Sequence, residues 1–449
     1  MKVYQINNEM ASSIPAGKEA SFQGGYHIFA LKWLLLVLLV VGCVVFSISR
    51  DPPPKSHYSA LCVPRFEHKA LTLRDGRVLA VGGTPDSARM LSSAEMYDPE
   101  NRFWRRVADM PEPMFPEYMW QLNDGRVLVY GHVRFGRTLM DQVFLYDIQA
   151  DRWLAASPMK AGEQGWLEGA VYQQQRPLLI AEARARPEQR VYFGSTAVLM
   201  AGDKLLVSGG ILRNTDNHHS KSSENSAFIL DIAQAQWQET LPMHDARRAH
   251  TLTLLDDGRV LAAGGSTSYP DDTLLHSVEV FDPSTGAWQQ VASMHGTHAD
   301  TQALLLPDGR VVVTGNNSDA VKIRVGNSEI EGRKWQWQGV MEVYDTANDR
   351  WEQVVSGFRQ IDYILLLADG RVAALQDGGF GTPHIMLWNP LSHKWSDILS
   401  GYHQRSRFVM TQLGDNHLML TGGQIHVTRS KRGFFEPVDA VDFLNLPPI

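Results

Sequence analysis

Arginine and histidine recur at one position of a repeated pattern in this chain, and both can bind an anion. The pattern is a short turn, usually Asp-Gly, at positions 75, 124, 202, 257, 308, 369 and 415. Ten residues before these turns stand, in order, Arg65, Met114, Tyr192, Arg247, His298, Arg359 and Arg405. Guanidinium groups bind carboxylate or phosphate through two parallel hydrogen bonds, so a ring of them predicts a channel mouth that receives a small acidic ligand.

A second set of residues follows three positions later in the same units. It comprises His68, Glu117, Ser195, His250, Thr301, Asp362 and Phe408. Within this set, the imidazoles of His68 and His250 and the carboxylates of Glu117 and Asp362 could transfer protons on a bound ligand. A regular strand directs residues i and i+3 to opposite faces, so the two sets converge only if the backbone there is irregular.

A structural role is the alternative for the same arginines. Glu95, Glu279 and Glu342 stand in the similar segments AEMYD, VEVFD and MEVYD, and they are candidate partners for the arginines. In such ion pairs the guanidinium groups would tie neighbouring repeats together. The sequence leaves both interpretations open.

The turns themselves indicate β-hairpins. In HTLTLLDDGRVLAAGG, residues 250–265, Asp257-Gly258 lies between two alternating apolar runs. Asp-Gly is a strong hairpin signal because the tight turn needs positive φ, which glycine adopts without strain. Gly264-Gly265 then ends the second strand, where the backbone must turn or approach another segment closely. Repeats of roughly fifty residues predict a β-propeller with one four-stranded blade in each unit.

A second marker lies downstream in most units, where an aromatic residue followed by Asp or Asn precedes a Trp by seven positions. The pairs are Tyr97 and Trp104, Tyr146 and Trp153, Phe281 and Trp288, Tyr344 and Trp351, and Trp388 and Trp395, with Leu230 and Trp237 as a variant. This order of turn, Gly-Gly, aromatic-Asp and Trp resembles the kelch repeat over about residues 57–449. The resemblance implies an all-β, seven-bladed kelch-type propeller of antiparallel blades, with each Trp in blade packing.

The seventh unit lacks a strand that begins with Trp, because the sequence ends at Ile449 soon after the strand-like segment 438–443. A propeller must pair its last blade with its first, since a free sheet edge invites aggregation. We expect residues 57–63, which precede the first hairpin, to supply the missing strand. Six blades with an additional hairpin is the alternative.

Two enzyme families share this architecture. The hairpins resemble those of the galactose oxidase propeller, whose copper chemistry needs a Cys cross-linked to a Tyr, a second Tyr and two His. No such set can be assigned here, so we predict no copper and no other cofactor. Sialic acid mutarotases are also kelch propellers, and they bind an acidic sugar in an arginine-rich site. The arginines resemble that arrangement in type, but the motif cannot be mapped residue by residue.

The N-terminal region contains one apolar segment long enough to cross a membrane. Residues 28–48 would span about 30 Å of hydrocarbon as a helix, with Trp33 as an interfacial anchor. A lipoprotein leader ending at Cys43 and an ordinary cleaved signal are the alternatives. The sequence therefore predicts a tail (1–27), a transmembrane signal-anchor (28–48), a proline-rich stalk (49–56) and the propeller (57–449). Flanking charges leave the orientation undecided, and we expect the propeller to be extracytoplasmic.

Composition limits the remaining possibilities. The chain has 449 residues, 44% hydrophobic and 20% charged, and its net charge of −7 argues against nucleic-acid binding. Its two cysteines are too few for a disulfide framework and form no metal-site spacing. We expect a binding module for a protein partner or a surface glycan, with the insert 321–340 as one candidate contact. An enzyme acting on a small acidic sugar and a structural envelope component are the alternatives.

Overall fold

The computed structural model describes residues 60–86, 88–135, 138–156, 166–168, 191–213, 222–267, 273–297, 299–325, 328–355, 361–376, 383–400, 405–414, 417–429 and 432–447. These residues belong to one compact unit, Tyr58–Ile449. The expected tail (1–27), transmembrane helix (28–48) and stalk (49–56) lie outside the described residues. Among the residues that the structure describes, no helix is long and apolar enough to cross a membrane.

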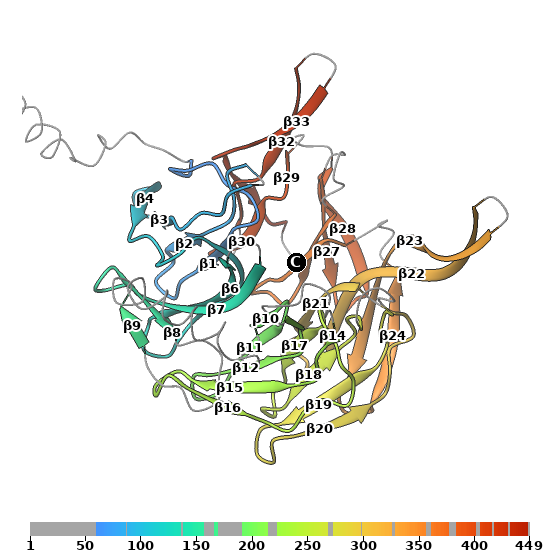
Figure 1. The fold of residues 1–449 in the computed structure, drawn as a ribbon. Helices are drawn as coiled ribbons and strands as arrows, with labels where there is room; N and C mark the ends of the chain where they lie inside the picture. Colours follow the sequence, from blue (N-terminus) through green and yellow to red (C-terminus); the bar gives the residue numbers. More distant parts are fainter. Residues whose placement is uncertain are drawn as a thin grey trace, which may run out of the picture. The chain divides into compact units, whose positions relative to one another are not determined.

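The described chain is all β, and its successive antiparallel sheets are called blades 1 to 7 here (Figure 1). Blade 1 contains β1 (Lys69–Thr72), β2 (Val78–Val81), β3 (Ala94–Asp98) and β4 (Phe103–Val107). Blade 2 contains β5 (Met114–Gln121), β6 (Val127–Phe135), β7 (Thr138–Asp147), β8 (Arg152–Ala156) and a fifth strand, β9 (Trp166–Glu168). Blade 3 contains β11 (Thr196–Met200), β12 (Lys204–Ser208), β15 (Ala227–Asp231) and β16 (Gln236–Glu239).

The remaining blades repeat this order. Blade 4 contains β17 (Thr251–Leu254), β18 (Val260–Ala263), β19 (Val278–Asp282) and β20 (Ala287–Val291). Blade 5 contains β21 (Ala299–Leu305), β22 (Val311–Val325), β23 (Ser328–Asp345) and β24 (Arg350–Val355). Blade 6 contains β25 (Tyr363–Leu366), β26 (Val372–Gln376), β27 (His384–Asn389) and β28 (Lys394–Ser400). Blade 7 contains β30 (Val409–Leu413), β31 (His417–Thr421) and β34 (Val441–Asn445).

The predicted Asp-Gly hairpins are confirmed between the first and second strands. In blade 4, β17 pairs with β18 around Gly258, whose φ is 85°. The Asp257 carboxylate accepts a hydrogen bond from the Arg259 backbone N–H at 3.0 Å, which holds the tight turn. The same contact recurs in blades 1, 2, 5 and 6, at Asp75, Asp124, Asp308 and Asp369.

The aromatic and Trp markers mark the third and fourth strands, as predicted. Tyr97 on β3 lies directly opposite Trp104 on β4, with ring centroids 5.3 Å apart. Trp153 of blade 2 is almost fully buried and donates its indole N–H to the Ala108 carbonyl at 2.7 Å. Because Ala108 follows the last strand of blade 1, this Trp joins neighbouring blades, so its predicted packing role is confirmed.

Each blade packs against the next through a cluster of buried apolar side chains. A further cluster joins blade 7 to blade 1, with Met419 of β31 against Val78, Ala80, Tyr97 and Trp104. The first strands also contact one another, since β1 contacts both β5 and β30. The described sheets therefore form a closed ring, as the seven-unit interpretation expects.

The Gly-Gly pairs lie where two blades approach each other closely. Gly210 of blade 3 donates its N–H to the carbonyl of Arg247, which precedes blade 4, at 2.9 Å. A Cβ atom at Gly209 would lie 2.2 Å from that same oxygen. The contact recurs between blades 7 and 1, where the Gly423 N–H donates to the Arg65 carbonyl at 2.7 Å. Glycine is required here because any side chain would separate the blades.

The expected fourth strand of blade 7 is not formed by the described part of residues 57–63. Residues 60–63 contain no strand, and Leu61 makes one backbone hydrogen bond, to the carbonyl of Asp439. The next two N–H groups, of Cys62 and Val63, donate instead to the Glu95 carboxylate of blade 1. That carboxylate takes the donors a strand would have needed, so the expectation was wrong for these residues.

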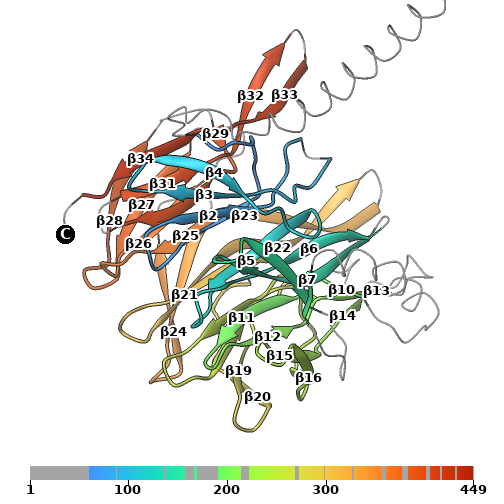
Figure 2. The ribbon, with the colours of Figure 1, turned by 90° about the vertical axis from the view of Figure 1, so that its left-hand side faces the viewer.

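Several blades lengthen their second and third strands beyond the ring. Most strands have four or five residues, whereas β22 has 15 and β23 has 18. Further extensions are β6–β7 in blade 2, β13 (Ile211–Arg213) with β14 (Ser222–Ser223) and β10 (Val191–Phe193) in blade 3, and β32 (Gln424–Arg429) with β33 (Arg432–Pro437) and β29 (Arg405–Ser406) in blade 7. The connections between the second and third strands lie at the same end of every blade. These hairpins therefore project from one face of the ring (Figure 2).

Candidate functional site

Arg65 and Arg247 lie inside their blades and are fully buried. Arg65 Nη2 lies 2.5 Å from Glu95 Oε1, and its Nη1 donates to the carbonyls of Gly82 and Ser93. The Arg65 guanidinium is therefore surrounded by acceptors from its own blade.

The Arg247 contacts follow the same plan in blade 4. Its Nη2 lies 2.7 Å from Glu279 Oε1, and its Nη1 donates to the Gly264 carbonyl at 3.0 Å. Glu279 also accepts the backbone N–H groups of His244 and Asp245. A buried charge is tolerated because it is paired and hydrogen-bonded.

Glu342, the third candidate partner from the sequence, accepts backbone N–H groups from His295 and Gly296. We call Glu95, Glu279 and Glu342 the clamp glutamates, because each holds the chain segment that enters its blade. Arg405, in blade 7, is nearly buried and lies 2.8 Å from the carboxylate of Asp442.

Arg65, Arg247 and Arg405 therefore have a structural role, but their ion pairs lie within one blade and do not tie neighbouring repeats together. The expected arginine-lined mouth is not found at these three residues. None of the three lines the central cavity described below. Their side chains are directed into the blades, where Glu95, Glu279 and Asp442 pair with the guanidinium groups of Arg65, Arg247 and Arg405. His298 and Arg359, the other members of that set, lie outside the described residues.

A backbone irregularity separates the two predicted sets. Glu67, Ala249 and Arg407 adopt positive φ of 53°, 49° and 54°, immediately before His68, His250 and Phe408. Left-handed backbone is uncommon for residues other than glycine. It reverses the chain, so the arginine turns into its blade while the residue three positions later enters the first strand.

His68 and His250 are buried and occupy equivalent positions between blades. His250 Nε2 lies 2.9 Å from the Ser208 hydroxyl of blade 3, and His68 Nε2 lies 2.9 Å from the Thr421 hydroxyl of blade 7. Burial, and next the charge of a nearby arginine, holds the pKa of both imidazoles well below the ordinary value. Both are therefore neutral at pH 7, and they connect blades as hydrogen-bonding groups.

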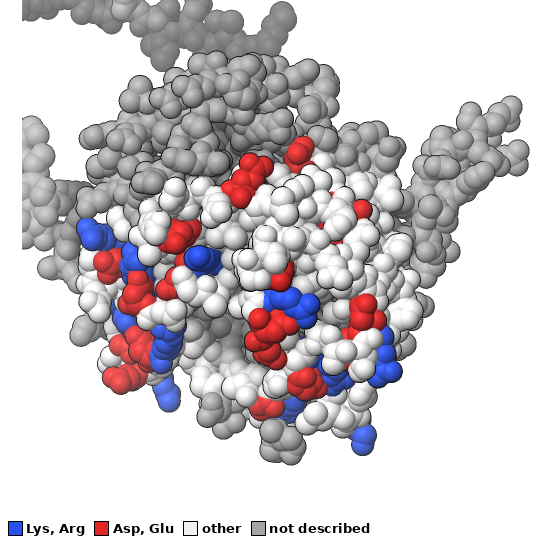
Figure 3. Space-filling model, turned by 90° about the horizontal axis from the view of Figure 1, so that it is seen from below, with Lys and Arg blue, Asp and Glu red and all other residues white. Residues whose placement is uncertain are grey.

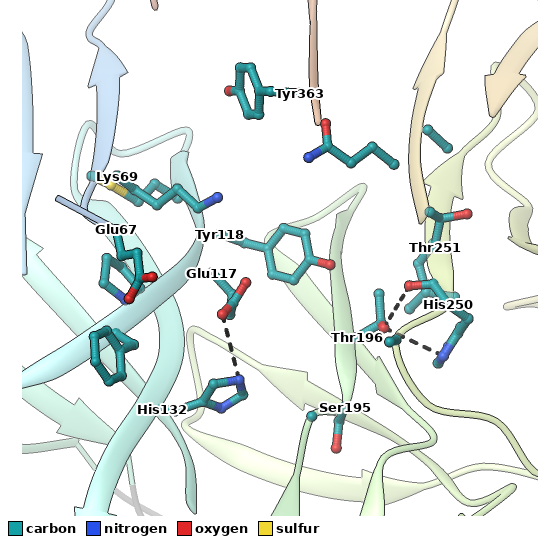
Figure 4. A pocket seen from close by; sticks show the side chains of 18 of the residues that line it. Glu67, Lys69, Glu117, Tyr118, His132, Ser195, Thr196, His250, Thr251 and Tyr363 are labelled. Atoms are coloured by element: carbon teal, nitrogen blue, oxygen red, sulfur yellow. Dashed lines mark hydrogen bonds and ion pairs between the residues drawn. The ribbon is translucent and has the colours of Figure 1, made fainter. Parts of the chain in front are cut away.

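A cavity of about 830 Å³ lies where the first strands of the seven blades meet. Its lining includes Glu117, Ser195 and His250 from the predicted set, with Lys69, Tyr118, Thr196 and Tyr363 among the others (Figure 4). His68 and Asp362 are not among the lining residues. Asp362 instead uses its carbonyl to accept a hydrogen bond from the Gln302 amide of blade 5 at 2.9 Å.

Glu117 enters the cavity because β5 is irregular. Pro116 pairs with Gly131 of β6 and Tyr118 pairs with Tyr130, so Glu117 has no partner in the register and forms a bulge. Bulges commonly redirect a side chain. The Glu117 side chain is 44% exposed, and its Oε1 lies 3.7 Å from Nε2 of His132.

His132 is held from the other side by Asp141. The two residues are direct partners across β6 and β7, and His132 Nδ1 lies 2.8 Å from Asp141 Oδ1. The buried Asp141 carboxylate also accepts the Ser195 backbone N–H of blade 3 at 3.3 Å. This arrangement fixes the ring so that Nε2 is directed toward Glu117, as Figure 4 shows.

The electrostatics of this triad favour a charged imidazole. Burial alone lowers the pKa of His132, but the close contact and charge of Asp141 outweigh it, with a further contribution from the charge of Glu117. The pKa of His132 is consequently above the ordinary value. Burial raises the pKa of the adjacent Tyr130, and the charge of Asp141 raises it further, so its hydroxyl stays protonated. An oriented imidazole beside a half-exposed carboxylate can hold or exchange a proton with a ligand.

Sequence reasoning found Glu117 but missed its two partners. His132 and Asp141 lie on the second and third strands of blade 2, whereas the aligned sets sampled only the approach to the first strand. The signal available in the sequence was the unusual length of the strand pattern over β6 and β7, because both residues lie in those two strands.

Surface charge gives no single-sign patch on the face in Figure 3, where Lys and Arg side chains are interspersed with Asp and Glu. Within the described residues, no group of three or more His, Cys, Asp and Glu side chains has the arrangement of a metal site.

Comparison with known sequences supports the kelch resemblance. The kelch motif family model matches residues 68–111 and 247–295, which contain all four strands of blades 1 and 4. Beta-scruin of Limulus polyphemus is 21% identical over 249 residues, 54% of this chain and 23% of the relative. Kelch-like protein 23 of Mus musculus is 26% identical over 233 residues, 51% and 33% of the two chains.

Kelch-like protein 36 of Bos taurus is 22% identical over 306 residues, 64% of this chain and 40% of the relative. The chain thus spans about a quarter to two fifths of the length of these curated relatives. The motif match, the relatives and the antiparallel blades together support a kelch-repeat protein with an all-β, propeller-like fold.

Proposed function

We propose that this kelch-repeat chain is a binding module that engages a protein partner through the face built by its extended hairpins. The observation that carries the proposal is that β6–β7, β13–β14, β22–β23 and β32–β33 all project from the same end of their blades. Long connections in repeat folds cluster on the binding face. The names of the curated relatives, scruin and kelch-like protein, add support for a module of this class.

Site-specific photo-crosslinking tests which face binds. A photoreactive amino acid replaces Lys322 on the β22–β23 hairpin in one variant, and Asp257 in a first-to-second turn at the opposite end of blade 4 in the other. We expect the position 322 variant to crosslink to a discrete partner in cells and the position 257 variant not to. Crosslinks from position 257 alone would contradict the proposal.

A shortened hairpin provides the matched variant. Ser318 and Trp335 are opposite each other in the register, so replacing residues 319–334 with Asn-Gly leaves a tight turn between them. We expect this variant to melt like the parent and to lose the partner identified by crosslinking. Undiminished binding of that partner would remove the hairpin from the binding face.

The same proposal attaches the module to a membrane through residues 28–48, with the propeller on the extracytoplasmic side. Its support is the apolar segment in the sequence, which has no charge from Trp33 to Ile48. Alkaline carbonate extraction should leave the full-length chain in the membrane pellet. External protease should digest the propeller of intact cells or spheroplasts, and digestion only after lysis would reverse the assigned side.

A further inference from the structure

We propose that the central cavity binds a neutral polyhydroxylated small molecule, such as a mono- or disaccharide, with Glu117 and His132 as its main polar contacts. This inference is separate from the partner-binding face, because it concerns the cavity formed by the first strands. The cavity has a volume of about 830 Å³, within the range of sites for small ligands.

The spacing of Glu117 and His132 suits a hydroxyl group. Their nearest atoms, Oε1 and Nε2, are 3.7 Å apart, which exceeds the length of a direct hydrogen bond. Both side chains are nevertheless directed toward the same space (Figure 4). A hydroxyl is both donor and acceptor, so one ligand hydroxyl can donate to the Glu117 carboxylate and accept from the Nε2–H group of His132.

Asp141 makes this recognition selective for one orientation of the ring. Its carboxylate is 2% exposed and lies 2.8 Å from His132 Nδ1, so the donor on Nε2 is the one that can reach a ligand. Because Asp141 is also bound by the Ser195 N–H, blades 2 and 3 together fix the imidazole. A preorganised donor beside an acceptor binds a hydroxyl without the cost of ordering side chains.

The charges around the cavity favour a neutral ligand. Lys69, Arg248 and His132 line it, and so do the carboxylates of Glu67 and Glu117, of which Glu67 is paired with Arg407. Because both signs line the same cavity, an anion would lie beside the Glu117 carboxylate and a cation would lie beside the Lys69 ammonium and the Arg248 guanidinium. The buried arginines that could have offset a ligand carboxylate, Arg65 and Arg247, are bound within their blades.

The rest of the lining suits the mixed surface of a sugar ring. Tyr118 and Tyr363 present aromatic rings at the cavity, and Leu71, Met119 and Leu365 add apolar surface. Aromatic and aliphatic side chains pack against the C–H faces of a ring, while a few placed polar groups select its hydroxyls.

The experiment measures binding to the purified full-length protein by saturation-transfer NMR and calorimetry. The neutral probes are glucose, galactose, mannose, maltose and lactose, and the charged probes are glucuronate and glucosamine, which keep the ring of glucose and change its charge. We expect at least one neutral probe to bind with a lower Kd than either charged probe. Absence of binding by every neutral probe at tens of millimolar, or tighter binding of a charged probe, would overturn the proposal.

Glu117→Ala localises the site. A charge-assisted hydrogen bond lost from the ligand should raise Kd roughly ten- to a hundredfold. Asp124→Asn, at an exposed turn of the same blade, should leave Kd unchanged. Glu117→Gln, which keeps the side-chain shape, replaces the alanine variant if that variant fails to fold. A Kd unchanged in the Glu117 variant would move the ligand elsewhere and refute the assignment.

Discussion

Replacing Glu279 with glutamine tests whether the clamp glutamates stabilise their blades. Glu279 is fully buried and accepts contacts from Arg247 and from the backbone N–H groups of His244 and Asp245. The amide of glutamine has one acceptor oxygen and one donor nitrogen, so one side of the former carboxylate must face N–H donors. Arg247 would also remain as a buried charge without its closer carboxylate, since Glu279 lies 2.7 Å away and the partly exposed Asp245 lies 3.4 Å away.

The expected cost follows from that loss. Breaking a buried ion pair by removing one partner destabilises a protein by about 3–5 kcal/mol. Unfolding entropies near 2.1 cal/mol/K per residue make each kcal/mol worth roughly 1.2 °C in a domain of this size, so we expect Tm to fall by about 4–6 °C. Calorimetry of the full-length protein at several scan rates measures the change.

The same blade supplies a matched control. Asp257→Asn also converts a carboxylate that pairs with an arginine into an amide, but Asp257 and Arg259 are 50% and 43% exposed. Exposed pairs contribute about 0–1 kcal/mol, so Tm should fall by about 1 °C or less. A Glu279→Gln variant that melts with the Asp257→Asn variant would refute the reasoning. Adding Arg247→Met to Glu279→Gln should recover part of the loss, because it removes a buried charge whose remaining carboxylate is that of the partly exposed Asp245, 3.4 Å away.

Three further changes test other features. Gly209→Ala should destabilise the fold more than Gly258→Ala in calorimetry. Both glycines have positive φ, but only at Gly209 would a Cβ lie 2.2 Å from the Arg247 carbonyl oxygen. Equal losses of stability would contradict the close approach of the blades. Since the pKa of His250 is lowered on folding, the unfolded state binds its proton first, so stability should fall by up to about 1.4 kcal/mol per pH unit as pH decreases below about 6.5. Urea titrations of His250→Gln should show a shallower loss, and an unchanged slope would assign it to other groups. Partial burial, followed by the charge of Glu95, raises the pKa of the Cys62 thiol to about 12, although the residue as a whole is exposed. Iodoacetamide at pH 8 should therefore alkylate it at least tenfold more slowly than a free thiol, in a variant whose other cysteine is serine. Reaction at the free-thiol rate would refute the shift.

The blades could be predicted from the sequence because their signals are local. Asp257-Gly258 specifies its turn through glycine's positive φ and a carboxylate contact two residues away, and the aromatic-Trp pairs face each other across one short turn. The closed ring could be predicted from the repetition of these units alone. The sequence indicated that the backbone turns or approaches another segment closely at each Gly-Gly pair. The structure identified that segment as the start of the next blade, such as the Arg247 carbonyl for Gly210.

The site was predicted only in part, because its geometry depends on contacts distant in the sequence. Spacing alone placed Arg247 and Glu279 as a possible pair, but it could not show that the guanidinium is buried. The bulge at Glu117 and the cross-strand pair of His132 and Asp141 have no local sequence signal. The expected strand at residues 57–63 was wrong for its described part because the clamp glutamate Glu95 competes for the same N–H groups.

The cluster between blades 7 and 1 has a consequence for how the chain folds during its synthesis. His68 contacts Thr421 across 353 residues, and the apolar face of blade 1 is covered by blade 7, which a ribosome makes after the other six blades. At about 5–20 residues per second, that face waits roughly 20–70 s for its cover. Newly made blade 1 should therefore bind chaperones until blade 7 emerges, and substitutions that slow closure should reduce the yield of folded protein before they change its equilibrium stability.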